Sequence, residues 1–148
     1  MTHEEYMKCA VELAKEAAKC GEVPVGCVIA DKNGEIIGKG RNRREETKST
    51  LAHAEIEAIE QACRKKGDWR LSDCTIYVTL EPCPMCAGAI INARAEKLFY
   101  GAKEEHSGSC GSVINLFMER YDQKTQITGG ILEKECKELL REFFKKRR

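Results

Sequence analysis

Two short motifs constrain this sequence more than any other feature, because together they supply one histidine, one glutamate and two cysteines. His53 and Glu55 stand two residues apart, and Cys83 and Cys86 follow in the segment Pro-Cys-Pro-Met-Cys. Cysteines three residues apart in a turn share one face, and a histidine elsewhere in the fold can complete a set of three metal ligands. We therefore expect His53, Cys83 and Cys86 to hold a zinc ion.

Such a ligand set leaves the fourth position of tetrahedral zinc open. Structural zinc sites are usually closed by four protein ligands, whereas catalytic sites keep one position for water. An open site beside the carboxylate of Glu55 indicates hydrolysis, in which Glu55 takes a proton from water and passes it to the substrate and the leaving group. Two alternatives remain open. Cys83 and Cys86 could form a redox or purely structural pair. The carboxylate of Glu55 could merely interact favourably with the dipole of a helix that starts there.

The length of the chain limits the number of domains, and its net charge does not identify a binding partner. With 148 residues it is long enough for one domain and too short for two ordinary ones, so we expect a single domain over residues 1–148. The formal net charge of +1 by itself favours no nucleic-acid partner. Residues 134–148 carry seven basic and three acidic side chains and form the basic end. No apolar run reaches the roughly 20 residues that span a bilayer, so no membrane association is expected.

The cysteines favour a reducing compartment. There are nine, an odd number, and no signal peptide precedes the first expected helix, so we expect a cytoplasmic protein. Cys110 lies in a loop of glycines and serines and is expected not to be a ligand, because three ligands are already accounted for. The cysteines among apolar neighbours are expected to act as small buried hydrophobic residues: Cys9, Cys27, Cys63, Cys74 and Cys136.

Hydrophobic periodicity predicts an α/β fold. Helical patterns cover residues 2–20, 53–67, 85–92, 113–117 and 132–143, and strand patterns cover residues 23–30, 35–40, 74–80, 96–101 and 125–129. An opening hairpin followed by alternating helices and strands predicts a three-layer α/β/α architecture around a mixed five-stranded sheet. Both motifs then lie at helix N-termini, whose partial positive charge favours thiolates. In the helix that starts at the histidine, the expected apolar stripe consists of Ile56, Ile59, Ala62 and Cys63.

Beyond the two motifs, the sequence resembles the bacterial tRNA-specific adenosine deaminases of the cytidine deaminase-like superfamily, nearly from end to end. His-x-Glu followed by Pro-Cys-x-x-Cys is the signature of zinc nucleobase deaminases in general. The similar segments are residues 23–26, 42, 53–56, 79–90, 101–102 and 130–144. The last of these points to the tRNA-specific family in particular.

The resemblance implies a fold, a reaction and a partner. It implies one zinc ion per subunit on His53, Cys83 and Cys86, with Glu55 as the catalytic proton shuttle and Asn42 in contact with the target base. It also implies a homodimeric hydrolase that takes the wobble adenosine of a tRNA anticodon loop, flipped out of its stack, and converts it to inosine. From the residues alone, Asn42 fits a turn residue equally well.

Recognition of an anticodon loop needs basic side chains for the phosphates and a pocket for an unstacked base. Arg41, Arg43 and Arg44 and the run of residues 145–148 could supply this charge, although a terminal basic run also fits a solvated tail.

Four aromatic residues have expected roles in packing, at an interface or, for one phenylalanine, in contact with a base. Of Phe143 and Phe144, one fits the core stripe of the last helix, and the other either packs or stacks on a base. Trp69 and Tyr121 are expected in the core or at an interface.

The sequence departs from the family in two loops that are expected to border the nucleic acid. Ser49, Thr50 and Leu51 stand where the family usually has Asp-Pro-Thr, and Glu104 and His106 replace an aspartate and a lysine. The lysine would be a permanent phosphate-binding charge, whereas a histidine is mostly neutral at pH 7.

Two other functions remain compatible with the sequence. A deaminase of a free base or nucleoside, of the cytosine or guanine type, would use the same zinc chemistry without a basic surface. A zinc-stabilised RNA-binding module would bind RNA without any turnover.

Overall fold

A mixed five-stranded sheet forms the centre of the molecule in the computed structural model, which describes residues 1–122 and 124–147. The strands are β1 (Gly26–Ala30), β2 (Ile36–Arg41), β3 (Thr75–Leu80), β4 (Lys97–Ala102) and β5 (Gln126–Thr128), in the order β2-β1-β3-β4-β5. β1 pairs antiparallel with β2 and with β3, whereas β3, β4 and β5 are parallel. Arg148, the last residue of the expected basic run, lies outside the described residues.

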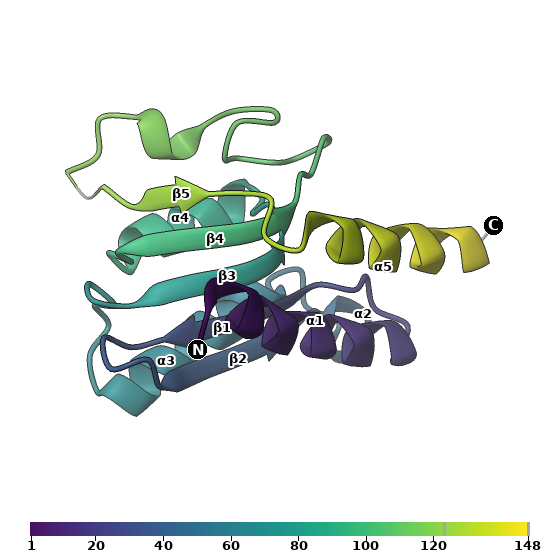
Figure 1. The fold of residues 1–148 in the computed structure, drawn as a ribbon, viewed down its shortest axis with the longest axis horizontal. Coiled ribbons are helices and arrows are strands. Elements are labelled where there is room, and N and C mark those ends of the chain that lie inside the picture. Colours follow the sequence, from purple (N-terminus) through teal and green to yellow (C-terminus); the bar gives the residue numbers. More distant parts are fainter. Residues whose placement is uncertain (123, 148) are drawn as a thin grey trace.

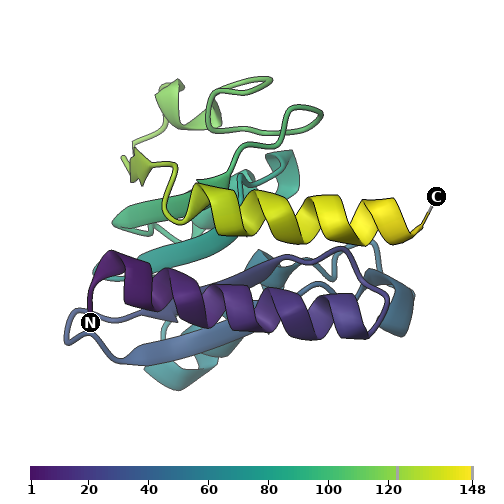
Figure 2. The ribbon, with the colours of Figure 1, turned by 45° about the vertical axis from the view of Figure 1, so that its right-hand side comes forward.

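Helices cover both faces of this sheet, which confirms the predicted three layers. The main helices are α1 (His3–Lys19), α3 (Ala54–Lys66), α4 (Pro84–Asn92) and α5 (Glu133–Lys146); α2 (Arg44–Thr47) and the 3-10 turn η1 (Leu116–Met118) are short. α1 and α5 lie side by side on one face, and α3 and α4 lie on the other (Figures 1 and 2). α5 starts near the C-terminal end of β4, and its C-terminal turns project beyond the ends of the strands (Figure 1).

The sheet separates two hydrophobic clusters. Cys27 and Ile29 of β1 belong to the cluster under α3 and α4, while Val28 and Ala30 belong to the cluster under α1 and α5. Successive side chains of a strand point to opposite faces, so a strand covered on both sides is apolar at every position. All five residues of β1 are buried for this reason.

The buried face of α3 differs from the expected stripe. Its buried residues are Ala54, Glu55, Ala58 and Ala62, whereas Ile56 and Ile59 are only half-buried. The reason is the close approach of β2. A Cβ atom added to Gly40 would lie 2.1 Å from the Ala54 carbonyl oxygen, and one added to Gly38 would lie 2.3 Å from that of Ala58. Small residues on both elements permit this contact, which also turns Glu55 inward.

Several local expectations also need correction. β2 extends to Arg41, one residue beyond the expected strand, and a short helix that was not expected begins at Arg44. The first strand begins at Gly26, and the helix expected over residues 113–117 is a 3-10 turn at Leu116–Met118. Trp69 and Tyr121 are 53% and 48% exposed, so they do not belong to the core, and the alternative role at an interface stays a prediction.

The expected burial of cysteines is confirmed for Cys27, Cys74 and Cys136, whereas Cys9 and Cys63 are only partly buried. Among residues 1–122 and 124–147, no helix combines the length and the apolar character needed to cross a membrane.

Candidate active site

The three predicted ligands meet where two helices begin. His53 is the N-cap residue of α3 and Cys83 is that of α4, while Cys86 lies in the first turn of α4. The Nδ1 atom of His53 lies 3.6 Å from the Sγ atom of Cys83 and 3.5 Å from that of Cys86. All three donor atoms lie within 4.8 Å of one another.

These separations fit a tetrahedral metal site. Bonds of about 2 Å to nitrogen and about 2.3 Å to sulfur, at a tetrahedral angle, place the two ligand atoms about 3.5 Å apart. The observed distances of 3.6 and 3.5 Å agree with this value. Cys110 is not among the three residues of this group.

Hydrogen bonding at the site shifts the pKa values of the two thiols in opposite directions. The Cys86 thiol and then the His53 ring lower the pKa of Cys83 to about 4, against the effect of burial. The pKa of Cys86 is raised, because its proton is held by Cys83 and because the side chain is buried. The hydrogen bond to Cys83 raises the pKa of His53. One thiolate is thus available at once, whereas Cys86 must release its proton when a metal binds.

Glu55 lies beside the ligands on the first turn of α3. Its side chain is buried, with 4% exposure, and burial raises its pKa to about 7. A carboxyl group that titrates near neutral pH can both accept and donate a proton, which is the property that a general acid and base needs.

A cavity of about 210 Å³ joins these residues to the candidate base-binding residue. Its lining includes Asn42, His53, Glu55 and Cys83. It also receives Phe144 from the projecting end of α5, about ninety residues beyond Glu55 in the sequence. The fold therefore gathers both motifs, Asn42 and one of the two candidate aromatic residues around one space.

Asn42 holds the start of α3 with its side chain. Its Oδ1 atom accepts a hydrogen bond from the backbone N–H of Ala54 at 2.9 Å, and its Nδ2 atom donates to the Val23 carbonyl at 3.1 Å. An amide group has two N–H donors and two acceptor lone pairs. Asn42 therefore keeps one donor and one acceptor for a ligand in the cavity.

Sequence reasoning missed Glu81, which organises the segment after β4. Its buried carboxylate accepts hydrogen bonds from the backbone N–H groups of Glu104, Cys110 and Ser112 and from the Ser112 hydroxyl. Although burial raises it, these bonds hold the pKa of Glu81 below its usual range. The feature of the sequence that could have pointed to Glu81 is a charged residue at the end of an apolar strand, directly before Pro82 and Cys83.

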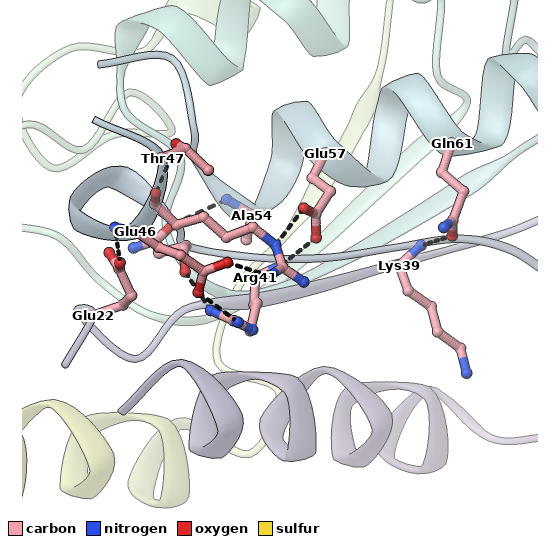
Figure 3. Close-up of polar contacts among 10 residues, drawn as sticks. Glu22, Lys39, Arg41, Glu46, Thr47, Ala54, Glu57 and Gln61 are labelled. Carbon is pink, nitrogen blue, oxygen red and sulfur yellow. Dashed lines mark hydrogen bonds and ion pairs between the residues drawn. The ribbon is translucent and has the colours of Figure 1, made fainter. Parts of the chain in front are cut away.

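Glu22 was also missed, and its carboxylate plays the same part for α2, whose first residue, Arg44, lines the cavity. Its carboxylate, only 2% exposed, accepts hydrogen bonds from the backbone N–H groups of Glu45 and Glu46, at 3.1 and 2.8 Å. It thereby fixes the first turn of α2 (Figure 3).

The arginines of residues 41–44 are not equivalent. Arg41 is buried and donates to Glu46 at 3.0 Å (Figure 3). Arg43 donates to Glu57 at 2.6 Å and to Glu46 at 3.0 Å. The expectation that these two side chains offer free charge to phosphates was therefore wrong, because carboxylates of the same chain already neutralise them.

The residues that depart from the family lie at different depths. Glu104 lines the cavity, and its Oε1 atom accepts a hydrogen bond from the backbone N–H of His106, whose side chain is exposed. Leu51 is 56% exposed and lines a separate apolar groove.

The comparisons with known proteins agree with this site. The sequence matches the MafB19-like deaminase family over residues 1–148. The chain belongs to this family of deaminases. Among its relatives, the tRNA-specific adenosine deaminase of Bacillus subtilis (strain 168) is 46% identical over all of this chain and 92% of that protein. The tRNA-specific adenosine deaminase of Haemophilus influenzae is 41% identical over 98% of this chain and 84% of that protein.

Solved structures of deaminases have the same fold. One, from a study of A-to-I editing by tRNA:A34 deaminases at the wobble position of transfer RNA, matches with a TM-score of 0.88 and 37% identity, over 92% of this chain and 99% of that chain. The guanine deaminase from Bacillus subtilis matches with a TM-score of 0.66 and 44% identity, over 70% of this chain and 66% of that chain. The resemblance to bacterial tRNA-specific adenosine deaminases and the cytidine deaminase-like fold are confirmed.

Proposed function

We propose that this MafB19-like deaminase is a zinc-dependent hydrolase that converts adenosine to inosine at the wobble position of a tRNA anticodon loop. The observation that carries the proposal is the placement of the Glu55 carboxylate in one cavity with two of the three metal donors, next to the third. The relatives named as tRNA-specific adenosine deaminases are similar over this whole chain, which supports the choice of substrate.

His53, Cys83 and Cys86 would hold the zinc ion, one per chain. Their mixed nitrogen and sulfur donors are those that zinc prefers in tetrahedral sites. When bound, zinc would supply the Lewis acidity that makes water a nucleophile near neutral pH.

Glu55 would move the protons. Its carboxylate accepts a proton from the attacking water while a C–O bond forms at C6 of adenine, and then delivers that proton to the ring nitrogen. Glu55 then takes the second proton, from the new hydroxyl at C6, and delivers it to the exocyclic amine. The bond from C6 to that amine breaks, ammonia leaves, and a carbonyl remains. The pKa of about 7 lets the same carboxyl group serve both steps.

Asn42 and Phe144 would position the base. The free donor and acceptor of the Asn42 amide can pair with polar atoms on the edge of a purine, and the ring of Phe144 at the same cavity can contact a base face.

We also propose that the chain acts as a single domain and pairs with a second copy of itself. A groove of about 680 Å³ beside α3 and α4 is lined by apolar side chains that include Leu51, Ile56, Met85 and Tyr121. Leu51 and Tyr121 are about half exposed in the single chain. Large exposed apolar patches usually mark interaction sites, and a second copy would cover this one.

A free purine base is the second candidate substrate, because the similarity to guanine deaminase extends over 70% of this chain. The decisive experiment incubates metal-loaded protein with tRNA transcripts that carry adenosine at the wobble position and reads inosine by reverse transcription and sequencing. Parallel reactions with guanine, cytosine and adenosine measure ammonia release. Inosine at that one position supports the tRNA function; ammonia from a free base without any inosine overturns it.

A further inference from the structure

Arg44 differs from its two neighbouring arginines because its guanidinium has no partner within the part of the chain that the structure describes. Arg41 and Arg43 form ion pairs with Glu46 and Glu57. The side chain of Arg44 is in no such pair and is exposed. One permanent positive charge therefore remains available in this segment.

The backbone that carries Arg44 is firmly held. It begins α2, where the buried carboxylate of Glu22 binds the backbone N–H groups of Glu45 and Glu46. The carboxylate of Glu46 in turn pairs with Arg41, as Figure 3 shows. The cation is thus presented from a fixed turn rather than from a free loop.

Arg44 borders the catalytic cavity with an exposed side chain. It lines that cavity together with Asn42, His53 and Glu55, and it also lines an adjoining cavity of about 310 Å³. The side chain therefore borders both cavities.

Arg44 differs in the sign of its charge from the glutamates that line the catalytic cavity. Among the described residues that line it, Arg44 is the sole lysine or arginine, and three glutamates line it as well: Glu55, Glu81 and Glu104. Among the charged side chains of the described residues that line this cavity, Arg44 would attract a phosphate group and the carboxylates would repel it.

We propose that Arg44 binds a backbone phosphate adjacent to the target nucleoside, and so selects a nucleotide within an RNA chain over a free base or nucleoside. This inference rests on the proposed function. A base flipped into the cavity stays attached through its sugar to two phosphates, which must remain near the entrance. A guanidinium can hold a phosphate through two charge-assisted hydrogen bonds, and a free base has no phosphate to offer.

The test compares Arg44→Gln with Lys48→Gln. Lys48 is exposed at the end of the same short helix, does not line either cavity, and its replacement removes the same charge. With an anticodon stem-loop RNA as substrate, Arg44→Gln should raise KM about tenfold and leave kcat within about twofold. Lys48→Gln should change neither by more than about twofold. Arg44→Lys should recover part of the loss, because it keeps the charge without the paired donors.

Two further readouts separate phosphate binding from a structural role. Arg44→Gln should reduce the slope of log affinity against log salt by about 0.7 to 1, the value for one phosphate contact. Replacing a single phosphate beside the target by a neutral methylphosphonate should weaken binding to the wild-type protein and have no further effect on Arg44→Gln. An unchanged KM, an unchanged salt slope, or an equal effect of Lys48→Gln would overturn the assignment. All of these comparisons need a wild-type protein that forms inosine. If the proposed function itself is wrong, the wild-type protein forms no inosine, and this outcome is distinct from a failure of the Arg44 proposal.

Discussion

The Nδ1 atom of His53 lies 3.6 Å from the Sγ atom of Cys83, although thirty residues separate the two in the chain. Each residue caps a helix, His53 that of α3 and Cys83 that of α4. The contact exists because both helices pack on the same face of the sheet and begin at the same end of its strands. Metal binding and the packing of these two helices are therefore coupled.

Replacement of Glu55 by glutamine should abolish proton transfer and leave the metal site in place. Glutamine has nearly the same shape but cannot accept a proton, so turnover should fall at least about a hundredfold. Inosine formation and metal content by elemental analysis should be measured on the same preparation. Near-normal turnover by Glu55→Gln would contradict the role of Glu55 as the proton shuttle.

Loss of a single ligand should release the metal. His53→Ala and Cys83→Ala each leave two donors, so both variants should contain well below one metal ion per chain and show no deamination. Cys110→Ala provides the matched control, because this cysteine lies outside the donor group. Elemental analysis should find about one ion per chain in the control; metal loss there would make Cys110 a ligand after all.

Glu81→Gln should loosen one wall of the catalytic cavity. The amide N–H₂ group would face backbone N–H donors that now bind a carboxylate, so the free energy of unfolding should fall by about 1–3 kcal/mol. Turnover should fall with it, because Glu104 lines the cavity. Chemical denaturation and turnover measurements check both effects against Glu105→Gln, an exposed neighbour that should behave like the wild type.

Gly40→Ala should displace α3. The new Cβ atom would lie 2.1 Å from the Ala54 carbonyl oxygen, so the helix must shift, at a cost of about 1–3 kcal/mol in unfolding free energy. Because Glu55 follows Ala54, activity should fall as well. Lys39→Ala on the same strand is exposed and should stay within about 0.5 kcal/mol of the wild type in denaturant titration. Equal stability of the two variants would refute the tight contact of strand and helix.

The sequence determined the chemistry of the site and most of the elements around it. His53, Glu55, Cys83 and Cys86 could be found because donor types at fixed spacing are a local property of the chain, and strands and helices follow from local periodicity. The predicted mixed sheet between helix layers is confirmed for the same reason: each element carries its own pattern of apolar residues.

The tertiary structure decided which side chains reach the site from afar and which charges remain free. Glu22 and Glu81 bind backbone N–H groups of distant segments, and Phe144 reaches the cavity from the last helix. Nothing in the local sequence shows that Arg41 is neutralised while Arg44 has no ion-pair partner among the described residues. Hydrogen bonds and ion pairs between segments depend on which surfaces the fold brings together, and that is a property of packing rather than of residue order.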